Sequence, residues 1–427
     1  MNICVVALGK IGLPLAVQFA AKGHRVIGAD VNEKVVELVN AGTEPFPGEF
    51  DLDRLLKETV DAGLLTATTD TAAAVAEADA VVVVVPLFVD AEGVPDFGWM
   101  DAATKAIAAG LKPGTLVSYE TTLPVGTTRD RWAPMLAEGS GLTPGEDFHL
   151  VFSPERVLTG RVFADLRRYP KLVGGIDEAS ARRGVEFYEA VLDFDERADL
   201  PRPNGVWDLG TSEASEMAKL AETTYRDVNI GLANQFARFA DKTGIDVKKV
   251  IEACNSQPYS HIHQPGIAVG GHCIPIYPRM YLWNDPEATV VRSAREANAA
   301  MPAYAVDLLA AAYGDLTGVN VLVLGAAYRG GVKETAFSGV YGTVEALKER
   351  GAVPFVSDPM YTAQELTAHG LPPHNGEQIT AAILQADHAE YRELAAADLP
   401  DVRVLVDGRR TTDPARWEGV RRVVIGG

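Results

Sequence analysis

The feature that most constrains the fold is a strand–turn–helix–strand pattern at the start of the chain. An apolar run at residues 3–7 is followed by a glycine-containing turn at 9–14, a helical pattern at 15–22 and a second apolar run that ends at Asp30. This pattern is typical of a βαβ unit, in which two parallel strands are joined by a crossover helix. The chain is therefore predicted to begin with a parallel sheet covered by helices.

Further apolar runs, separated by helical patterns, extend this unit. They lie at residues 80–85, 116–119 and 149–152, and a Pro-Arg-Pro-Asn-Gly linker follows at 201–205. Strands that alternate with helices in this way predict a doubly wound parallel sheet, the Rossmann-like architecture. The fold class is therefore α/β.

The second half of the chain opens with one long helical pattern from Ser212 to Thr243. A helix of this length needs a partner surface, which is either the junction between two domains or its own copy in another subunit. From Val319 a second strand–turn–helix pattern begins, with later apolar runs at 353–356 and 402–406. The last part is therefore predicted to be a second Rossmann-like α/β domain.

The turn after the first strand matches a phosphate-binding template. Residues 7–12, Ala-Leu-Gly-Lys-Ile-Gly, fill the G-x-G-x-x-G pattern with Ala7 in its first place, and Asp30 lies 21 residues after Gly9. The backbone at Gly9 and the helix N-terminus would hold a pyrophosphate, and Asp30 would accept hydrogen bonds from a ribose 2′-OH. Because that carboxylate would repel a 2′-phosphate, NAD is favoured over NADP. The alternative is an ordinary βα turn that binds no dinucleotide.

A lone thiol stands in a second glycine-containing segment. Gly270 and Gly271 precede His272 and Cys273. Glycines let a substrate approach the backbone, and a thiolate attacks a carbonyl carbon readily, so this segment indicates a nucleophile. The alternative is a buried structural cysteine, a description that fits the other two cysteines of the chain, Cys4 and Cys254, better.

Composition excludes several classes of partner. The chain of 427 residues carries 39 basic and 58 acidic residues, a formal charge of -19, which argues against nucleic acid or an anionic membrane as a partner. An odd number of cysteines, three, predicts a reducing cytoplasm, and no signal peptide or membrane span is expected. The histidines at 261, 263 and 272 have no second ligand cluster at compact spacing, so no metal site is predicted.

Ordered motifs run nearly end to end along the chain, at residues 7–14, 120–128, 153–158, 219–229, 270–275 and 406–409. Together they resemble the UDP-glucose/UDP-N-acetylmannosamine/GDP-mannose family of nucleotide-sugar 6-dehydrogenases. The residues at 154–158, 224–229 and 272–275 are closer to the N-acetylhexosamine branch of that family.

The resemblance implies an enzyme that oxidises the C6 alcohol of a UDP-(N-acetyl)hexose or UDP-glucose to a carboxylate with two NAD+, through an aldehyde held on a cysteine. Cys273 would form the thiohemiacetal and thioester, Lys219 would stabilise an oxyanion, and Thr122 and Glu155 would position or activate water. Thr223, four residues after Lys219 on the same helical face, could add a second donor. From the residues alone, the more usual roles are a solvated surface lysine for Lys219, a helix contact for Thr223, and an exposed loop carboxylate or helix cap for Glu155.

The resemblance also implies binding residues, domains and an assembly. A homodimer through the central helix is expected, with a sugar nucleotide as substrate. The expected domains are an NAD-binding domain at 1–200, a central helical segment with the cysteine loop at 201–302 and a nucleotide-sugar-binding domain at 303–427. The implied NAD-binding residues are Gly9, Lys10, Ile11, Gly12, Asp30, Pro86 and Thr122, and the implied substrate-binding residues are Arg156, Val157, Leu158, Lys219, His263, Gly270, Arg329 and Arg409.

The sequence departs from the family pattern at five positions. Tyr277 replaces an aspartate four residues after the cysteine, Thr223 replaces an asparagine, Tyr259 and Ala336 replace arginines, and Ala7 replaces a glycine. A phenol is not a carboxylate at neutral pH, and each lost arginine removes a charge-assisted contact. Two alternatives stay open: an enzyme that stops at the aldehyde or uses an unusual activated sugar, and a non-catalytic homologue that only binds sugar nucleotides.

Overall fold

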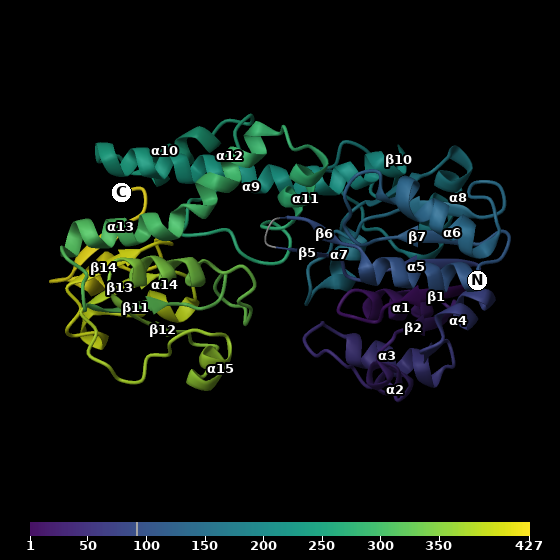
Figure 1. Cartoon of the computed structure of the whole chain (residues 1–427), viewed down its shortest axis with the longest axis horizontal. Helices are drawn as coiled ribbons and strands as arrows, with labels where there is room; N and C mark the ends of the chain where they lie inside the picture. The colour runs from purple at the N-terminus through teal and green to yellow at the C-terminus, as the bar shows by residue number, and fades with distance from the viewer. Residues whose placement is uncertain (91–92) are drawn as a thin grey trace. The chain divides into compact units, whose positions relative to one another are not determined.

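The computed structural model describes residues 1–90 and 93–427. It divides into two compact units, Met1–Ala221 and Glu222–Gly427, each built around its own parallel-dominated sheet (Figure 1). In the part of the chain that the structure describes, no helix combines the length and the apolar character that crossing a membrane requires.

The first unit contains an eight-stranded sheet in the order β10-β9-β8-β7-β4-β1-β2-β3. All neighbours are parallel except β8 and β9, so β9 and β10 run opposite to the other six strands. A small antiparallel pair, β5 (Phe88–Val89) and β6 (Pro95–Asp96), stands apart. The strands of the large sheet are β1 (Asn2–Val6), β2 (Arg25–Ala29), β3 (Leu65–Thr68), β4 (Ala80–Val83), β7 (Leu116–Tyr119), β8 (His149–Phe152), β9 (Lys171–Gly175) and β10 (Val206–Thr211).

Helices cover both faces of this sheet, as the near-continuous apolar strands require. Ile3 and Val5 of β1 pack with α1, α3 and α8, whereas Cys4 and Val6 pack on the opposite face with α4, α5 and α6. The predicted doubly wound architecture is therefore confirmed. The helices are α1 (Gly12–Ala21), α2 (Glu33–Asn40), α3 (Leu52–Asp61), α4 (Thr71–Glu77), α5 (Gly98–Gly110), a π-helical turn (Thr127–Trp132), α6 (Ala133–Ser140), α7 (Val162–Arg168) and α8 (Glu178–Val191).

The long helix α9 (Ser212–Thr243) has the bounds that its apolar pattern predicts. Its second half packs against α12 (Thr289–Ala299) through a buried polar network, in which Asp227 accepts hydrogen bonds from Arg295 at 2.6 Å and from Asn298 at 2.8 Å. The other helices of this region are α10 (Val247–Asn255), α11 (Tyr277–Asn284) and α13 (Met301–Tyr313).

The second unit carries an all-parallel sheet of five strands in the order β12-β11-β13-β14-β15. Its core contains buried side chains of α13 and α14 on one face of the sheet, which confirms the predicted second Rossmann-like α/β unit. The strands are β11 (Asn320–Leu324), β12 (Val353–Ser357), β13 (Ala381–Leu384), β14 (Val404–Asp407) and β15 (Arg421–Val424), and the helices are α14 (Gly339–Glu349) and α15 (Ala363–Ala368).

Candidate active site

The predicted cofactor residues follow four neighbouring strands of the first sheet. Gly9 follows β1, Asp30 follows β2, Pro86 follows β4 and Thr122 follows β7. These four strands are adjacent and parallel, so their carboxyl ends meet at one edge of the sheet. Ligands of open α/β sheets bind at this edge, which makes it the candidate dinucleotide site.

The phosphate-binding turn is tightly packed at one glycine and open at another. A Cβ on Gly12 would collide with the carbonyl oxygen of Ala7, so α1 can start this close to β1 only with glycine there. In the described part of the chain, nothing lies within 4 Å of a Cβ built on Gly9. Ala7 itself adopts a left-handed backbone, with φ at 75°. The turn therefore keeps the glycine-type conformation that the template requires, although alanine occupies the position.

Asp30 closes the turn. Its Oδ2 accepts a hydrogen bond from the backbone N–H of Leu8 at 2.7 Å, and its Oδ1 accepts one from Asn32 at 2.9 Å. A carboxylate has further lone pairs, and Asp30 is only partly buried, so ribose hydroxyls can still reach it. The open backbone at Gly9, the start of α1 and this acid fit a dinucleotide, which Gly9, Lys10, Ile11, Gly12 and Asp30 would hold.

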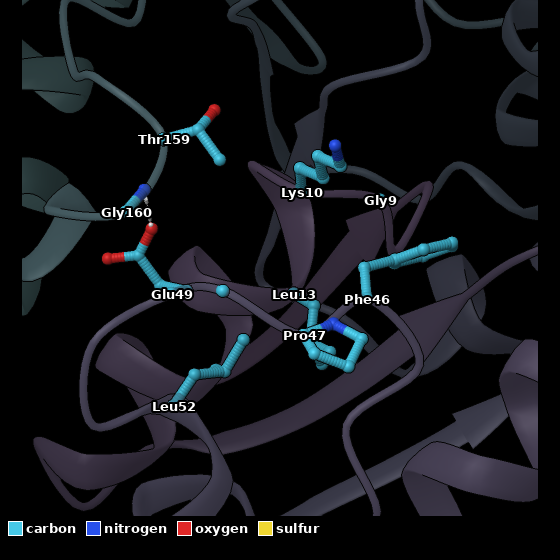
Figure 2. A pocket seen from close by; sticks show the side chains of 10 residues that line it. Gly9, Lys10, Leu13, Phe46, Pro47, Glu49, Leu52, Thr159 and Gly160 are labelled. Atoms are coloured by element: carbon cyan, nitrogen blue, oxygen red, sulfur yellow. Dashed lines mark hydrogen bonds between the residues drawn. The ribbon is translucent and has the colours of Figure 1, made fainter. Parts of the chain in front are cut away.

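A small cavity of about 80 Å³ lies beside the turn (Figure 2). Gly9, Lys10 and Leu13 line one part of it, and Thr159 and Gly160 line another. The remaining wall consists of Phe46, Pro47, Gly48, Glu49 and Leu52.

Glu49 ties the loop after β8 to this wall. Its carboxylate accepts hydrogen bonds from the backbone N–H groups of Gly160 at 2.6 Å and Val162 at 2.7 Å. The loop that carries the predicted substrate residues Arg156, Val157 and Leu158 is thereby held near the cofactor turn.

Glu155 belongs to a buried charge cluster at the same edge of the sheet. Lys171 makes ion pairs with Glu155 and, at 2.8 Å, with Glu120, and Tyr188 donates a hydrogen bond to Glu120 at 2.5 Å. Burial raises the pKa of Glu120 to about 8, an effect that the charge of Lys171 opposes and that of Glu155 reinforces. Burial alone would lower the pKa of Lys171, but the two carboxylates raise it above its ordinary value.

The start of α9 is anchored to the loop that follows β7. The buried carboxylate of Glu216 accepts hydrogen bonds from Gly126 N–H at 2.6 Å and from Thr128 N–H and hydroxyl at 2.9 and 2.7 Å. Burial raises the pKa of Glu216 to about 7 against these hydrogen bonds. Lys219 lies nearly one turn further along the helix with only 8% of its surface exposed, and Thr223 is also buried. Lys219 is therefore not a solvated surface lysine.

In the second unit, the cysteine segment is an exposed turn that leads into α11. The carbonyl oxygen of Cys273 accepts hydrogen bonds from Ile276 N–H at 3.2 Å and Tyr277 N–H at 3.0 Å. Gly271 has a φ of 91° and donates to Ala336 O at 2.9 Å, and a Cβ on Gly270 would collide with Tyr328. The glycines thus allow the turn to pack against the 328–336 segment.

The three cysteines are free and differ in environment. Cys273 is exposed, Cys254 is half-buried and Cys4 is buried. Burial raises the pKa of the Cys4 thiol to about 12, so that thiol stays protonated and inert. Of the three, Cys273 is the exposed one, and it lies four residues before Tyr277, the first residue of α11.

The other predicted substrate residues of the second unit lie in different environments. His263 donates its backbone N–H to Asn229 at 2.9 Å, and burial together with the charge of Arg226 lowers the pKa of its imidazole. Arg409 donates to the backbone oxygens of Gln385 at 3.1 Å and Ala268 at 3.3 Å, so it braces the segment before Gly270. Arg329 is more exposed and donates to Gly330 O at 3.3 Å.

Two of the positions that depart from the family pattern lie in this unit's loops. Tyr259 is 92% exposed, and Ala336 contributes its carbonyl oxygen to the bond with Gly271. Neither supplies the charge of the arginine that it replaces.

Comparison with known proteins identifies the family. Three models of the UDP-glucose/GDP-mannose dehydrogenase family match in order: the NAD binding domain at residues 1–192, the central domain at 213–300 and the UDP binding domain at 322–414. The chain belongs to this family. It is an NAD-dependent oxidoreductase, which confirms the predicted resemblance and cofactor.

Relatives of the dehydrogenase match over its full length. The UDP-N-acetyl-D-mannosamine dehydrogenase of Pyrococcus horikoshii is 33% identical over 420 residues, covering 96% of this chain and 95% of the relative. A solved structure of the UDP-D-ManNAc dehydrogenase from that organism aligns with a TM-score of 0.88 at 31% identity, over 100% of this chain and 99% of the other. The NDP-N-acetyl-D-galactosaminuronic acid dehydrogenase of Methanosarcina mazei Go1 aligns with a TM-score of 0.89 at 29% identity, covering 100% and 95%.

Sequence reasoning missed five residues around the site: Glu49, Glu120, Lys171, Tyr188 and Glu216. Each is a polar side chain buried by the fold of the first unit, and three of them touch one another through Glu120. The one available signal was that Glu120 directly follows an apolar strand, at the edge where ligands bind.

Proposed function

We propose that the dehydrogenase oxidises the C6 alcohol of a UDP-N-acetylhexosamine, with UDP-N-acetylmannosamine as the first candidate, to the corresponding uronate. The observation that carries this proposal is the end-to-end similarity to relatives named UDP-N-acetyl-D-mannosamine dehydrogenase. The motif wording at 154–158, 224–229 and 272–275 supports the same branch.

In the first half-reaction the C6 alcohol becomes an aldehyde. NAD+ supplies the hydride acceptor when bound at the turn formed by Gly9 to Gly12. The C6 carbon loses a hydride, and its hydroxyl loses a proton. Lys219 stabilises the negative charge that develops on the oxygen, and Thr223 on the same helix face adds a hydroxyl donor.

In the second half-reaction the aldehyde becomes an acid. The Cys273 thiolate adds to the carbonyl carbon and the carbonyl oxygen takes up a proton, which forms a thiohemiacetal. Loss of a second hydride from carbon and of that hydroxyl proton then gives a thioester. Water then attacks the thioester carbon, the C–S bond breaks and the thiolate is regenerated. Glu155 accepts the proton of that water, and Thr122 orients it. Two NAD+ are reduced for each sugar oxidised.

We assign the substrate contacts to the residues that the family resemblance implies. Arg156, Val157 and Leu158 lie in the loop that Glu49 anchors through its hydrogen bonds to Gly160 and Val162. The remaining proposed substrate-binding residues are His263, Gly270, Arg329 and Arg409. The three-part division at 1–200, 201–302 and 303–427 remains a prediction that limited proteolysis would test.

Tyr277 supports a second candidate, an enzyme that releases the aldehyde. Its backbone N–H bonds to Cys273 O, so it stands at the first turn of α11, four residues after the nucleophile. A tyrosine there cannot act as a carboxylate base or as an anionic partner during thioester hydrolysis. Slow acid release would follow.

Stoichiometry separates these candidates. Purified protein is incubated with NAD+ and UDP-N-acetylmannosamine, UDP-N-acetylglucosamine, UDP-glucose or GDP-mannose, and the NADH formed per sugar consumed is counted. A ratio near two supports full oxidation, and a ratio near one supports the aldehyde. Cys273→Ser is expected to keep ligand binding and lose acid formation, with Cys254→Ser as the matched control. Acid formation by the Cys273→Ser variant would exclude the thioester route.

We further propose that the protein is a homodimer in the cytoplasm, with α9 as the interface. Tyr225, Leu232, Phe236 and Phe239 recur at helical spacing along α9 and remain exposed, Phe239 by 61%. An apolar stripe of this kind on a long helix favours burial against a second copy. Phe239→Asp is expected to shift the species seen by sedimentation from dimer to monomer, and an unchanged dimer would place the interface elsewhere.

A further inference from the structure

A buried cluster behind Glu155 contains charged groups that the proposed mechanism does not use. The side chains of Glu120, Lys171 and Glu155 are 0%, 4% and 10% exposed. Charges buried this deeply destabilise a fold unless they are paired. Glu155 is the member nearest to solvent, so it is the one that can meet substrate water.

The sheet topology itself places these groups together. Strands β8 and β9 are antiparallel, with Phe152 opposite Gly174 and Val151 opposite Gly175. Extending this register by three residues brings Lys171, the first residue of β9, opposite Glu155. Glu120 follows β7, the parallel neighbour of β8, and its backbone oxygen accepts a hydrogen bond from Glu155 N–H at 3.3 Å.

The cluster holds one cation and two carboxyls. Two carboxylates that share one buried cation repel each other, so one of them favours its protonated form. Deep burial favours the protonated form of Glu120 and raises its pKa to about 8. Tyr188 of α8 donates a hydrogen bond to Glu120, and the Tyr188 hydroxyl also bonds to the Ser118 hydroxyl at 2.7 Å. Glu120 is the more deeply buried of the two acids, which favours the proton on it, and the two acids together favour the charged form of Lys171.

We propose that Lys171 is a positioning residue that holds Glu155 as a carboxylate, while Glu120 keeps the proton that the two acids would otherwise share. This inference rests on the proposed role of Glu155 in thioester hydrolysis. When water attacks the thioester carbon, its O–H bond breaks and the proton passes to Glu155, which later releases it to solvent. Two carboxyls in unlike environments thus take different roles, a division that enzymes use to keep one acid ionised beside another.

The groups that face Glu155 come from every element around it. They are Glu120 after β7, Arg156 in its own loop, Asp165 on α7, Tyr169 after α7, Lys171 on β9 and Tyr188 on α8. Lys171 is the cation paired directly with Glu155, so its removal has the largest expected effect on the ionisation of that acid.

The test compares Lys171→Met, Lys171→Arg and Glu120→Gln in the full-length enzyme with NAD+ and UDP-N-acetylmannosamine. Lys171→Met is expected to slow acid release about 100-fold, while the first hydride transfer in a single turnover changes by less than about threefold. It is also expected to move the acid limb of the pH profile upward by about 1–3 units, because an attractive cation is lost. Lys171→Arg restores most of the rate, and Glu120→Gln, which exchanges a protonated carboxyl for a neutral amide, leaves the acid limb unmoved.

Lys57→Met is the matched control, because it removes a lysine from an exposed helical ion pair with Asp61. It is expected to change neither rate nor pH profile. If Lys171→Met slows both hydride steps and acid release equally, with an unmoved acid limb, the lysine is only structural and the inference is overturned.

A second readout does not depend on turnover. The carboxyl of Glu155 is followed by 13C NMR in glutamate-labelled protein, assigned with Glu155→Gln, and its titration midpoint is compared between wild type and the variants. If Lys171→Met does not fold, Lys171→Gln removes the same charge and carries the comparison. A midpoint that does not shift when the lysine charge is removed, or that shifts in Glu120→Gln, overturns the inference even if acid is formed. A shifted midpoint without acid from any UDP-sugar supports the inference and rejects the proposed function instead.

Discussion

In each Rossmann-like unit an aspartate after the second strand accepts hydrogen bonds from the turn after the first strand, but the two aspartates differ in exposure. In the first unit Asp30 accepts hydrogen bonds from Leu8 and Asn32, and in the second Asp358 accepts them from Ala326 and Met360 at 2.8 Å each. The residue after the first strand, Ala7 or Gly325, bonds in each case to the end of the second strand.

The difference lies in what else the aspartate meets. Asp358 is buried and pairs with His388 at 3.1 Å, whereas Asp30 is partly exposed. In the first unit α1 starts six residues after β1, while in the second α14 starts fifteen residues after β11. Of the two units, the first therefore combines a partly exposed acid with a helix N-terminus close to the strand. The same fold binds NAD in one copy, and its second copy uses the corresponding acid for stability.

The largest expected effect comes from filling the tight turn of the first unit. Gly12→Ala places a Cβ against the carbonyl oxygen of Ala7, which cannot move without displacing β1. We expect a loss of about 3 kcal/mol in the free energy of unfolding by urea titration, together with loss of NAD binding.

Gly9→Ala is the matched control for this prediction. A Cβ at Gly9 meets nothing within 4 Å in the described residues, so the fold is expected to keep its stability while NAD binding weakens. Equal destabilisation by both variants would contradict the distinction between a packing glycine and a ligand-facing glycine.

The next effect separates the two aspartates. Asp358→Asn weakens a buried charge-assisted bond to His388 and is expected to cost about 2 kcal/mol of stability. Asp30→Asn is expected to cost less than about 1 kcal/mol but to weaken NAD binding about tenfold, by loss of charged acceptors for ribose. Urea titration and NAD titration calorimetry measure the two quantities. A larger loss of stability in Asp30→Asn than in Asp358→Asn would contradict the proposal that Asp358 stabilises the fold and Asp30 binds NAD.

A smaller effect concerns acid. Burial alone would raise the pKa of Asp358, but hydrogen bonds from His388, Met360 and Ala327 hold it below its usual value. A lowered folded-state pKa stabilises the fold above the unfolded value of about 3.9, and this contribution is lost as the pH falls through the folded value. Asp358→Asn should therefore flatten the decline of stability below about pH 4. An identical acid transition in both proteins would contradict this.

The smallest effect is expected at Ala7. Its φ of 75° is a strained backbone for alanine, costing about 1–2 kcal/mol, while glycine adds about 0.5–1 kcal/mol of unfolded-state entropy. Ala7→Gly should therefore raise the free energy of unfolding by about 0.5 kcal/mol. Gly325→Ala is the counterpart and should destabilise, because its φ is 102° and a Cβ would lie 2.5 Å from Ala386 Cβ. Stabilisation by both substitutions would show that the two turns are not equivalent.

Local patterns predicted most of the fold. The first βαβ unit, the bounds of α9 and the second α/β unit follow from apolar periodicity and turn residues, which depend on neighbours in sequence. Strand β9 was not predicted, since Lys171-Leu-Val-Gly-Gly is short and begins with a charge. The antiparallel direction of β9 relative to β8 depends on how distant strands pair, so no short stretch of sequence predicts it.

The sequence predicted some residues of the candidate site and missed others. Gly9, Gly12 and Asp30 carry a recognisable spacing, and Cys273 stands out as a lone thiol among glycines. Lys171 and Glu120 resemble ordinary surface residues in the sequence, because a buried ion pair is visible only after distant strands meet. Chemistry that depends on pairing across a sheet was therefore the part that sequence reasoning missed.

The reversed direction of β9 limits how this enzyme can change. The connection from β8 to β9 contains the loop that Glu49 holds by its hydrogen bonds to Gly160 and Val162, followed by α7. A slip of β9 by a single residue cannot be absorbed, because it would turn Lys171 toward the opposite face and leave two acids in the interior without their counter-ion. The pairing register of one short strand is therefore a constraint on the whole charge cluster.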